Sequence, residues 1–532
     1  MTEATDTGLV RCLVEMKGDV CGRPIYQAPE HDIEPVCLMH SQAPQKSDVE
    51  FQAEFERILS KAEEDKSIAD FTRFQFPSSD YYDRTFSVAC CFSHATFAQD
   101  ARFNGTTFTQ EVKFIDATFE LEAIFWLATF MQAPLFGGAT FAKKAYFDGA
   151  KFEQGANFYG ATFVFEATFD AVMFAQQAEF GAVTFSQGAY FGAATFAQGA
   201  TFYDATFILD TYFGSATFTG PADFEETKFF LSANFRNASF GDTASFRETS
   251  FRTDATMEPG LWFNEVKLEH PERIEFYKTD LSHALFYNTD VSKINFTLAR
   301  YRKRGKRFSL FEEVIDIEEF ADLAPTASSS DERNYSLIAE TYHQLKRNFD
   351  AKGDFWTAGH FHYGEMEMLR LHSRLRLKPL RWLAHNFSLT ALYKHGSSYG
   401  ESMKKPLAWL AAMILLFALL FPLPSLEVNP QAGEPGLAGW QVNYWNARQF
   451  FQEHDRENPV PRWMRQMTGG HAALPLLVHS GMTALSVAGF QKELRYSPAY
   501  PWGRAMAMLE LLLTTTLGGL FLLAIRRQYK RS

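Results

Sequence analysis

The sequence is poor in cysteine and has no excess of positive charge. Five cysteines in 532 residues do not suggest a disulfide scaffold. The 63 acidic and 51 basic residues give a net charge of −12, which argues against a general nucleic-acid binder. The first forty residues hold no apolar run typical of a secretory signal, so we expect none. A Walker loop, G-x-S-x-G, H-E-x-x-H and a dinucleotide fingerprint are also missing, and we expect no enzyme activity.

Phenylalanine is abundant and follows a fixed rhythm. From Phe86 to Phe251 a phenylalanine recurs at steps that alternate between six and five residues, and Met257 takes the next place. A small residue, usually Ala, often stands two positions before each Phe. Neither the two-residue period of a strand nor the 3.6-residue period of a helix fits these steps. The rhythm predicts a solenoid of short β segments in which each coil stacks its Phe on the neighbouring coils.

The repeats, for example ATFAQGATFYDATF at 194–207, resemble those of the pentapeptide-repeat family. The resemblance implies a right-handed, four-sided β-helix over residues 86–300. Its last coil is marked by a stricter five-residue spacing at Phe276, Leu281, Phe286, Val291 and Phe296. Some soluble members of the family use an acidic rod to imitate DNA. A DNA-mimicking inhibitor is therefore one interpretation, which a membrane anchor would disfavour.

A small module is expected ahead of the repeats. Cys12, Cys21 and Cys37 are followed by His40, in the pattern C-x8-C-G-R-P…C-L-M-H within residues 1–45. Three thiolates and one imidazole satisfy a tetrahedral zinc ion and leave no open position, so we expect a structural zinc knuckle. Similar modules precede the repeats in some bacterial pentapeptide-repeat proteins. Residues 46–85 contain an amphipathic helix expected to cap the rod, since a solenoid needs closed ends.

The chain becomes helical after the repeats. We expect a linker over 301–330 and a helical juxtamembrane domain over 331–404. A metal site is one hypothesis for His360, His362, Glu365 and Glu367. On a helix the two histidines point in different directions, and a structural role is the preferred interpretation. The vicinal Cys90 and Cys91, where the regular repeats begin, are expected to pack rather than to react.

Two apolar runs are long enough to span a bilayer. Pro406 to Leu426 holds no charge, and Ala505 to Ile525 holds only Glu510. We predict transmembrane helices at 405–426 and 503–526. An extracytoplasmic loop at 427–471 and a basic tail at 527–532 complete this region. Basic residues flank both outer ends, so the positive-inside rule places the N- and C-termini in the cytoplasm, at a bacterial inner membrane.

A third apolar stretch, at 472–492, resembles the re-entrant loop of two-span pore-loop channels. Of the T-V-G-Y-G filter of potassium channels only one glycine survives, in V-A-G-F-Q. Backbone of this kind inside a membrane must be shielded by protein or line water, so we expect a homo-oligomer, a tetramer by channel analogy. The candidate pore residues are Thr483, Ser486, Val487, Ala488, Gly489, Phe490, Glu510 and Thr514.

Two main functions follow from these patterns. The first is an oligomeric membrane protein with a channel-like pore and a cytoplasmic repeat rod that senses or docks a protein partner. The second is a membrane-tethered repeat scaffold whose apolar helices only anchor it. The lipid bilayer is a partner in both, and neither binds nucleic acid.

Overall fold

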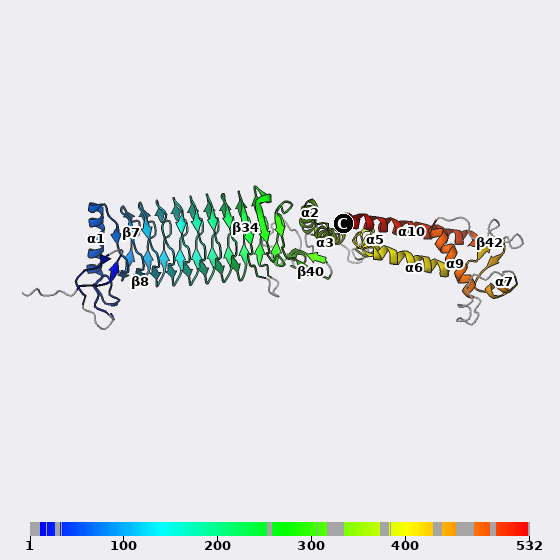
Figure 1. The fold of residues 1–532 in the computed structure, drawn as a ribbon, viewed down its shortest axis with the longest axis horizontal. Helices are drawn as coiled ribbons and strands as arrows, with labels where there is room; N and C mark the ends of the chain where they lie inside the picture. Colours follow the sequence, from blue (N-terminus) through cyan, green and yellow to red (C-terminus); the bar gives the residue numbers. More distant parts are fainter. Residues whose placement is uncertain are drawn as a thin grey trace, which may run out of the picture. The chain divides into compact units, whose positions relative to one another are not determined.

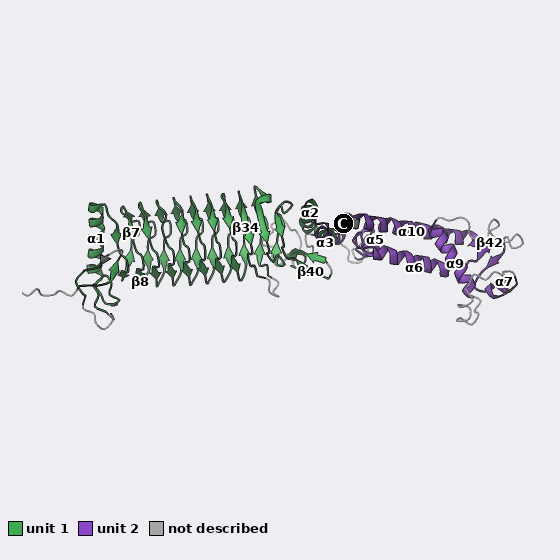
Figure 2. Ribbon diagram, in the orientation of Figure 1, with its two compact units in different colours: residues 1–352, 360–365 green, residues 353–359, 366–532 purple. Residues whose placement is uncertain are grey.

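The computed structural model describes residues 11–16, 19–26, 32, 34–252, 258–305, 307–315, 335–372, 382, 385–428, 439–453, 473–489 and 496–529. The chain divides into two compact units, residues 1–352 with 360–365, and residues 353–359 with 366–532 (Figure 2). Helix α3 (Phe355–Leu371) contributes residues to both units.

The first unit contains a β-solenoid of short parallel strands, most of them two residues long (Figure 1). Each coil crosses four sheets, so the predicted β-solenoid is confirmed. The first sheet runs from β4 (Gln75–Phe76) to β31 (Lys228–Phe229), and the second from β5 (Ser79–Asp80) to β38 (Ala284–Leu285). The third runs from β6 (Thr85–Phe86) to β36 (Lys267–Leu268). The fourth runs from β3 (Ala69–Asp70) to β39 (Asn295–Thr297), and its two parts are joined by isolated bridges at Leu135.

The alternating spacing of phenylalanine has a backbone cause. In two of the sheets the buried Phe is the second residue of its strand, as in β25 (Thr195–Phe196). In the other two it directly follows the strand, as Phe202 follows β26 (Ala200–Thr201). Corners spanned by five-residue steps carry a residue in the left-handed region two positions after the Phe, for example Asp204 at φ 52°. Gly and Asp favour that conformation, which explains their frequency in the gaps.

The solenoid begins earlier than the predicted start at Phe86. Its first strand, β3, starts at Ala69, and its first coil buries Phe71, Phe76 and Tyr81. These residues are spaced by five, without the six-residue steps on which the prediction relied. Helix α1 (Asp48–Asp65) covers this coil, with the Phe55 ring stacked on Phe71 at a centroid distance of 4.5 Å.

The other end of the solenoid is covered by segments that follow the repeats. Residues 301–315, predicted as part of a linker, form the hairpin β40 (Arg302–Arg304) and β41 (Arg307–Ser309) and the short helix η2 (Phe311–Glu313). In α2 (Tyr335–Ala351), Asn348 Nδ2 donates to the carbonyls of Val291 and Ile294 at 2.8 and 2.7 Å. Backbone groups of the last coil are thereby satisfied.

Glu312 makes the stability of this end depend on pH. Its side chain is 1% exposed and accepts a hydrogen bond from the Phe286 amide at 2.7 Å. Burial raises the pKa of Glu312 from 4.5 to about 7, so the folded state binds this proton more tightly than the unfolded chain. The free energy of unfolding should therefore increase by about 3 kcal/mol as the pH falls from above 7 toward 4.5.

Denaturant unfolding of the full-length protein at several pH values measures this effect. Glu312→Gln keeps an oxygen that accepts from Phe286 but does not titrate, so the variant should lose that part of the pH dependence. Equal pH dependence in the two proteins would show that Glu312 is not a buried acid.

The second unit is mainly helical. Helices α6 (Lys404–Leu420) and α10 (Tyr500–Tyr529) lie side by side, and α9 (Ala473–Ala488) packs against both (Figure 1). Strands β42 (Leu426–Val428), β43 (Gln441–Val442) and β44 (Tyr496–Pro498) form a small antiparallel sheet. Short helices α5 (Leu389–Ser397) and α7 (Ala447–Glu453) complete the unit.

Within the described residues, one helix is long and apolar enough to cross a membrane. It spans Tyr500–Arg527 of α10, and its most apolar 18-residue window has a mean hydropathy of 1.9. The predicted span at 405–426 is helical only as far as Leu420, and β42 begins at Leu426. The predicted re-entrant segment is the helix α9 up to Ala488. Two spans with a re-entrant loop therefore remain a prediction.

Candidate metal centre

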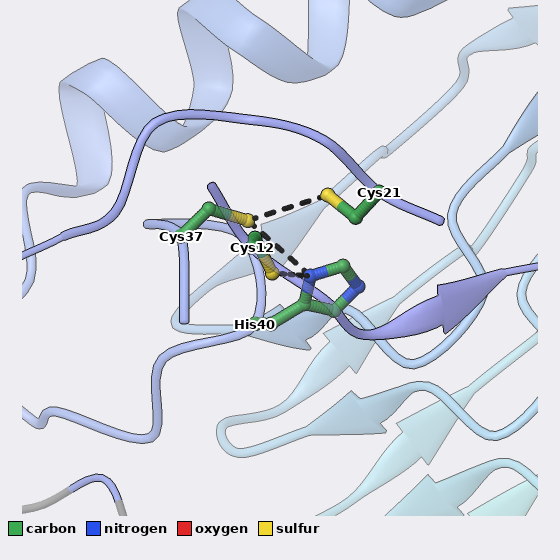
Figure 3. Close-up of side chains that lie close together, drawn as sticks. All are labelled: Cys12, Cys21, Cys37 and His40. Carbon is green, nitrogen blue, oxygen red and sulfur yellow. Dashed lines mark hydrogen bonds between the residues drawn. The ribbon is translucent and has the colours of Figure 1, made fainter. Parts of the chain in front are cut away.

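The four residues predicted to bind zinc meet at the N-terminal end of the first unit. Gly22, with φ 61°, turns the chain after Cys21, and its amide donates to the Cys12 carbonyl at 3.0 Å. A turn at residues 38–40 lets the His40 amide donate to the Cys37 carbonyl at 3.1 Å. These two turns bring all four side chains together (Figure 3).

The spacing of the ligand atoms suits a tetrahedral metal ion. Three sulfur atoms and one imidazole nitrogen lie within 4.8 Å of one another. The His40 Nδ1 atom is 3.5 Å from Cys12 Sγ and 3.2 Å from Cys37 Sγ. The sulfurs of Cys21 and Cys37 are 3.7 Å apart, close to the separation of about 3.8 Å that zinc–sulfur bonds of about 2.3 Å impose. All three cysteines are free thiols, so the site is available to a metal.

Surrounding groups orient the ligands. The His40 Nε2 atom donates to the Thr72 carbonyl at 3.2 Å, which leaves Nδ1 directed at the sulfurs, as outer partners of metal-binding histidines do. The Arg23 guanidinium donates to Cys21 Sγ at 3.3 Å and pairs with Glu54 at 3.0 Å. Hydrogen bonds from Cys37, His40 and Arg23 lower the pKa of the Cys21 thiol, and the thiolate is the form that binds a metal.

Lys46 links the module to the first coil, a role that no sequence pattern indicated. Its buried ammonium donates to the carbonyls of Ser41 at 2.8 Å and Leu38 at 3.3 Å, both in the module, and to that of Gln75 in β4. The His40–Thr72 bond and a hydrogen bond from the Gln75 amide to the Met39 carbonyl at 2.8 Å also join the knuckle to the solenoid. Cys12, Cys37 and His40 are 0%, 1% and 6% exposed, so a bound ion would be structural rather than catalytic.

The histidines and glutamates of the helical region form ion pairs. In the first unit, Glu365 accepts from His343 at 2.8 Å, His362 at 3.4 Å and Lys346 at 3.0 Å. Burial alone would raise the pKa of Glu365, but hydrogen bonds from His362, His343 and Lys346 lower this pKa to about 2. A lysine on the same carboxylate disfavours a metal ion there.

The other residues of this group are separated from Glu365. In the second unit Glu367 pairs with Arg370 at 2.8 Å and Lys394 at 2.7 Å, while in the first unit His360 packs its ring on Phe308.

Cys90 and Cys91 are buried in β7 (Cys90–Cys91), at 1% and 2% exposure. These positions suit structural roles.

The candidate pore residues lie in α9 and α10 and just after α9. Thr483, Ser486, Val487 and Ala488 belong to α9, Gly489 follows it, and Phe490 lies outside the described residues. Glu510 and Thr514, in α10, are 0% and 3% exposed. Thr514 donates to the Glu510 carbonyl at 2.8 Å, whereas the Glu510 carboxylate has no hydrogen-bond partner among the described residues. Both side chains are therefore enclosed within the second unit.

Comparison with known proteins identifies the repeats. A family model described as pentapeptide repeats (9 copies) matches residues 92–136 and 125–173. The match lies inside the solenoid, whose four-sheet coils agree with it. No curated protein and no solved structure matches the chain.

Proposed function

Because its solenoid is built from pentapeptide repeats, we propose that this chain is a membrane-tethered scaffold. Buried phenylalanines fill the interior of the solenoid, so only its outer faces are available to a partner. We assign α10 to the anchor, the outer faces to a cytoplasmic protein partner, and the Cys–His cluster to a structural zinc ion. This proposal gives the chain no catalytic role and places it at the bacterial inner membrane, with both termini in the cytoplasm.

The exposure of α10 is the observation that carries the proposal. Only 17% of its most apolar window is buried inside the protein. Met508, Leu512 and Leu522 are 73%, 66% and 65% exposed, and in the neighbouring α6 Leu415 is 67% exposed. The core helix of a water-soluble protein would bury such side chains, whereas a bilayer covers them.

The same unit favours an anchor over a channel. Val487 and Ala488 lie in helix α9, whereas a selectivity filter is a non-helical loop whose carbonyls line the pore. A side chain that lines a pore between subunits should be exposed on a single subunit, yet Glu510 is enclosed. Cation current through the reconstituted protein, lowered by Glu510→Gln, would instead establish the channel.

Extraction of membranes with alkaline carbonate tests the anchor. We expect the full-length chain to stay in the membrane pellet, because α10 exposes apolar side chains over a length that spans the hydrocarbon core. Leu512→Asp combined with Leu522→Asp should release it, since each charge at mid-membrane costs about 2.5–3.5 kcal/mol.

A matched control comes from the solenoid. Leu127 and Phe230 are 58% and 60% exposed there, and replacing both with Asp should leave the chain in the pellet. Release of the unmodified chain by carbonate would refute the tether.

A further inference from the structure

Helix α5 in the second unit has an apolar face that no described residue covers. Leu389 and Leu392 of α5 are 84% and 58% exposed, and Phe387 and Trp382, which precede the helix, are 67% and 60% exposed. The opposite side of α5 is fixed, because it packs against α6 and α10 and buries Ala391 and Gly396. Leu389 and Leu392 therefore belong to a helix that packs against α6 and α10, next to which it lies in Figure 1.

Basic side chains without an ion pair among the described residues lie near the C-terminal end of α5. The Arg527 guanidinium donates to the Tyr399 carbonyl at 2.5 Å, which places the end of α10 next to the turn between α5 and α6. Lys404 and Lys405, at the start of α6, and Arg526 are exposed and have no ion pair among the described residues. The free charges at this end of the unit are thus positive.

The carboxylates nearby are already occupied. Glu367 pairs with Arg370 and Lys394 and accepts from the Tyr399 hydroxyl at 2.8 Å. Glu401 lies 3.4 Å from Arg527. The three basic side chains are therefore left for an external anion.

We propose that this surface, consisting of Trp382, Phe387, Leu389, Leu392, Lys404, Lys405 and Arg526, binds the headgroups of anionic phospholipids. Helix α5 would lie in the headgroup layer with its apolar face toward the acyl chains, as amphipathic interfacial helices do. The basic side chains would contact lipid phosphates, as basic clusters next to membrane helices do. This inference rests on the proposed anchor, because the basic cluster flanks one end of α10.

Charge and aromatic content favour lipid over other anions. Trp409 is 45% exposed one turn into α6, and its indole nitrogen donates to the His395 carbonyl at 3.2 Å. Indole rings concentrate at the membrane interface, where one edge is polar and the rest apolar. A free phosphate ion would use the basic side chains but gain nothing from the apolar face of α5.

The test is lipid binding to the full-length protein in zwitterionic detergent micelles, measured by native mass spectrometry. Phosphatidylglycerol should bind more tightly than phosphatidylcholine. Replacing Lys404, Lys405 and Arg526 with Ala should lower the affinity for phosphatidylglycerol by about tenfold or more and leave the affinity for phosphatidylcholine unchanged. Phe387→Ser with Leu389→Ser should weaken both lipids. The control replaces three exposed lysines of the first unit with Ala, namely Lys61, Lys151 and Lys293, and so makes the same change of charge. It should leave the affinity for both lipids unchanged.

Three outcomes would overturn the inference. They are equal binding of the two lipids, an unaltered preference in the triple Ala variant, and inorganic phosphate binding as tightly as phosphatidylglycerol. Carbonate extraction separates this failure from failure of the anchor. A chain that resists carbonate but shows no preference refutes only the lipid surface, whereas a chain released by carbonate refutes the anchor whatever lipid it prefers.

Discussion

Full-length protein purified without chelator is expected to contain about one zinc ion per chain. The three sulfurs and the His40 nitrogen lie at tetrahedral spacing, and the Thr72 carbonyl already holds the imidazole in the binding orientation. In the described part of the module, regular structure is confined to the two-residue strands β1 (Glu15–Met16) and β2 (Asp19–Val20), so we expect the metal to be a main source of its stability. Structural zinc contributes on the order of 10–16 kcal/mol in small zinc modules.

Cys37→Ser should abolish zinc binding, because the variant removes a buried thiolate ligand. Elemental analysis measures the metal, and limited proteolysis of residues 11–45 reports on folding of the module. The control is Cys90→Ala, since Cys90 occupies the position two before Phe92 where the repeats usually carry Ala. Absence of zinc from the unmodified protein, or equal zinc in Cys37→Ser and Cys90→Ala, would refute the site.

The clustering of Cys12, Cys21, Cys37 and His40 could be predicted because their spacing along the chain is itself the signal. The groups that orient them could not. Thr72 acts through its backbone carbonyl, which every residue possesses, and Lys46 reaches three carbonyls from two parts of the chain. Such contacts depend on how the module docks on the first coil, and no local pattern encodes that.

The solenoid was predictable for a similar reason, since its core repeats with the period of the coil. The first coil was not predicted, because Phe71, Phe76 and Tyr81 fill the same interior with five-residue steps alone. In the second unit, the stretch at 472–492 was predicted to be re-entrant from its resemblance to pore-loop channels. Two of its hydroxyls bond to neighbouring segments, Ser480 to the Ala418 carbonyl at 2.5 Å and Thr483 to the Tyr496 carbonyl at 3.1 Å. Whether a polar residue lines water or bonds to a neighbouring segment depends on tertiary packing.

Phe196→Ala is expected to destabilise the solenoid by about 3–5 kcal/mol, the usual cost of emptying a buried aromatic site. The Phe196 ring is fully buried. It stacks on Phe174 at a centroid distance of 5.2 Å and on Phe218 at 4.8 Å, with interplanar angles of 7° and 5°. The substitution therefore removes contacts with the coils on both sides.

Gln198→Ala is the matched control, two residues along the same coil. Its side chain is exposed and no hydrogen bond from it is present, so the cost should be within about 0.5 kcal/mol. Denaturant unfolding of the two full-length variants measures the difference. Because a solenoid holds together through contacts between adjacent coils, weakening both faces of one coil should also divide the rod into two segments that unfold less cooperatively. Equal destabilisation by the two substitutions would mean that the phenylalanine ladder is not what joins the coils.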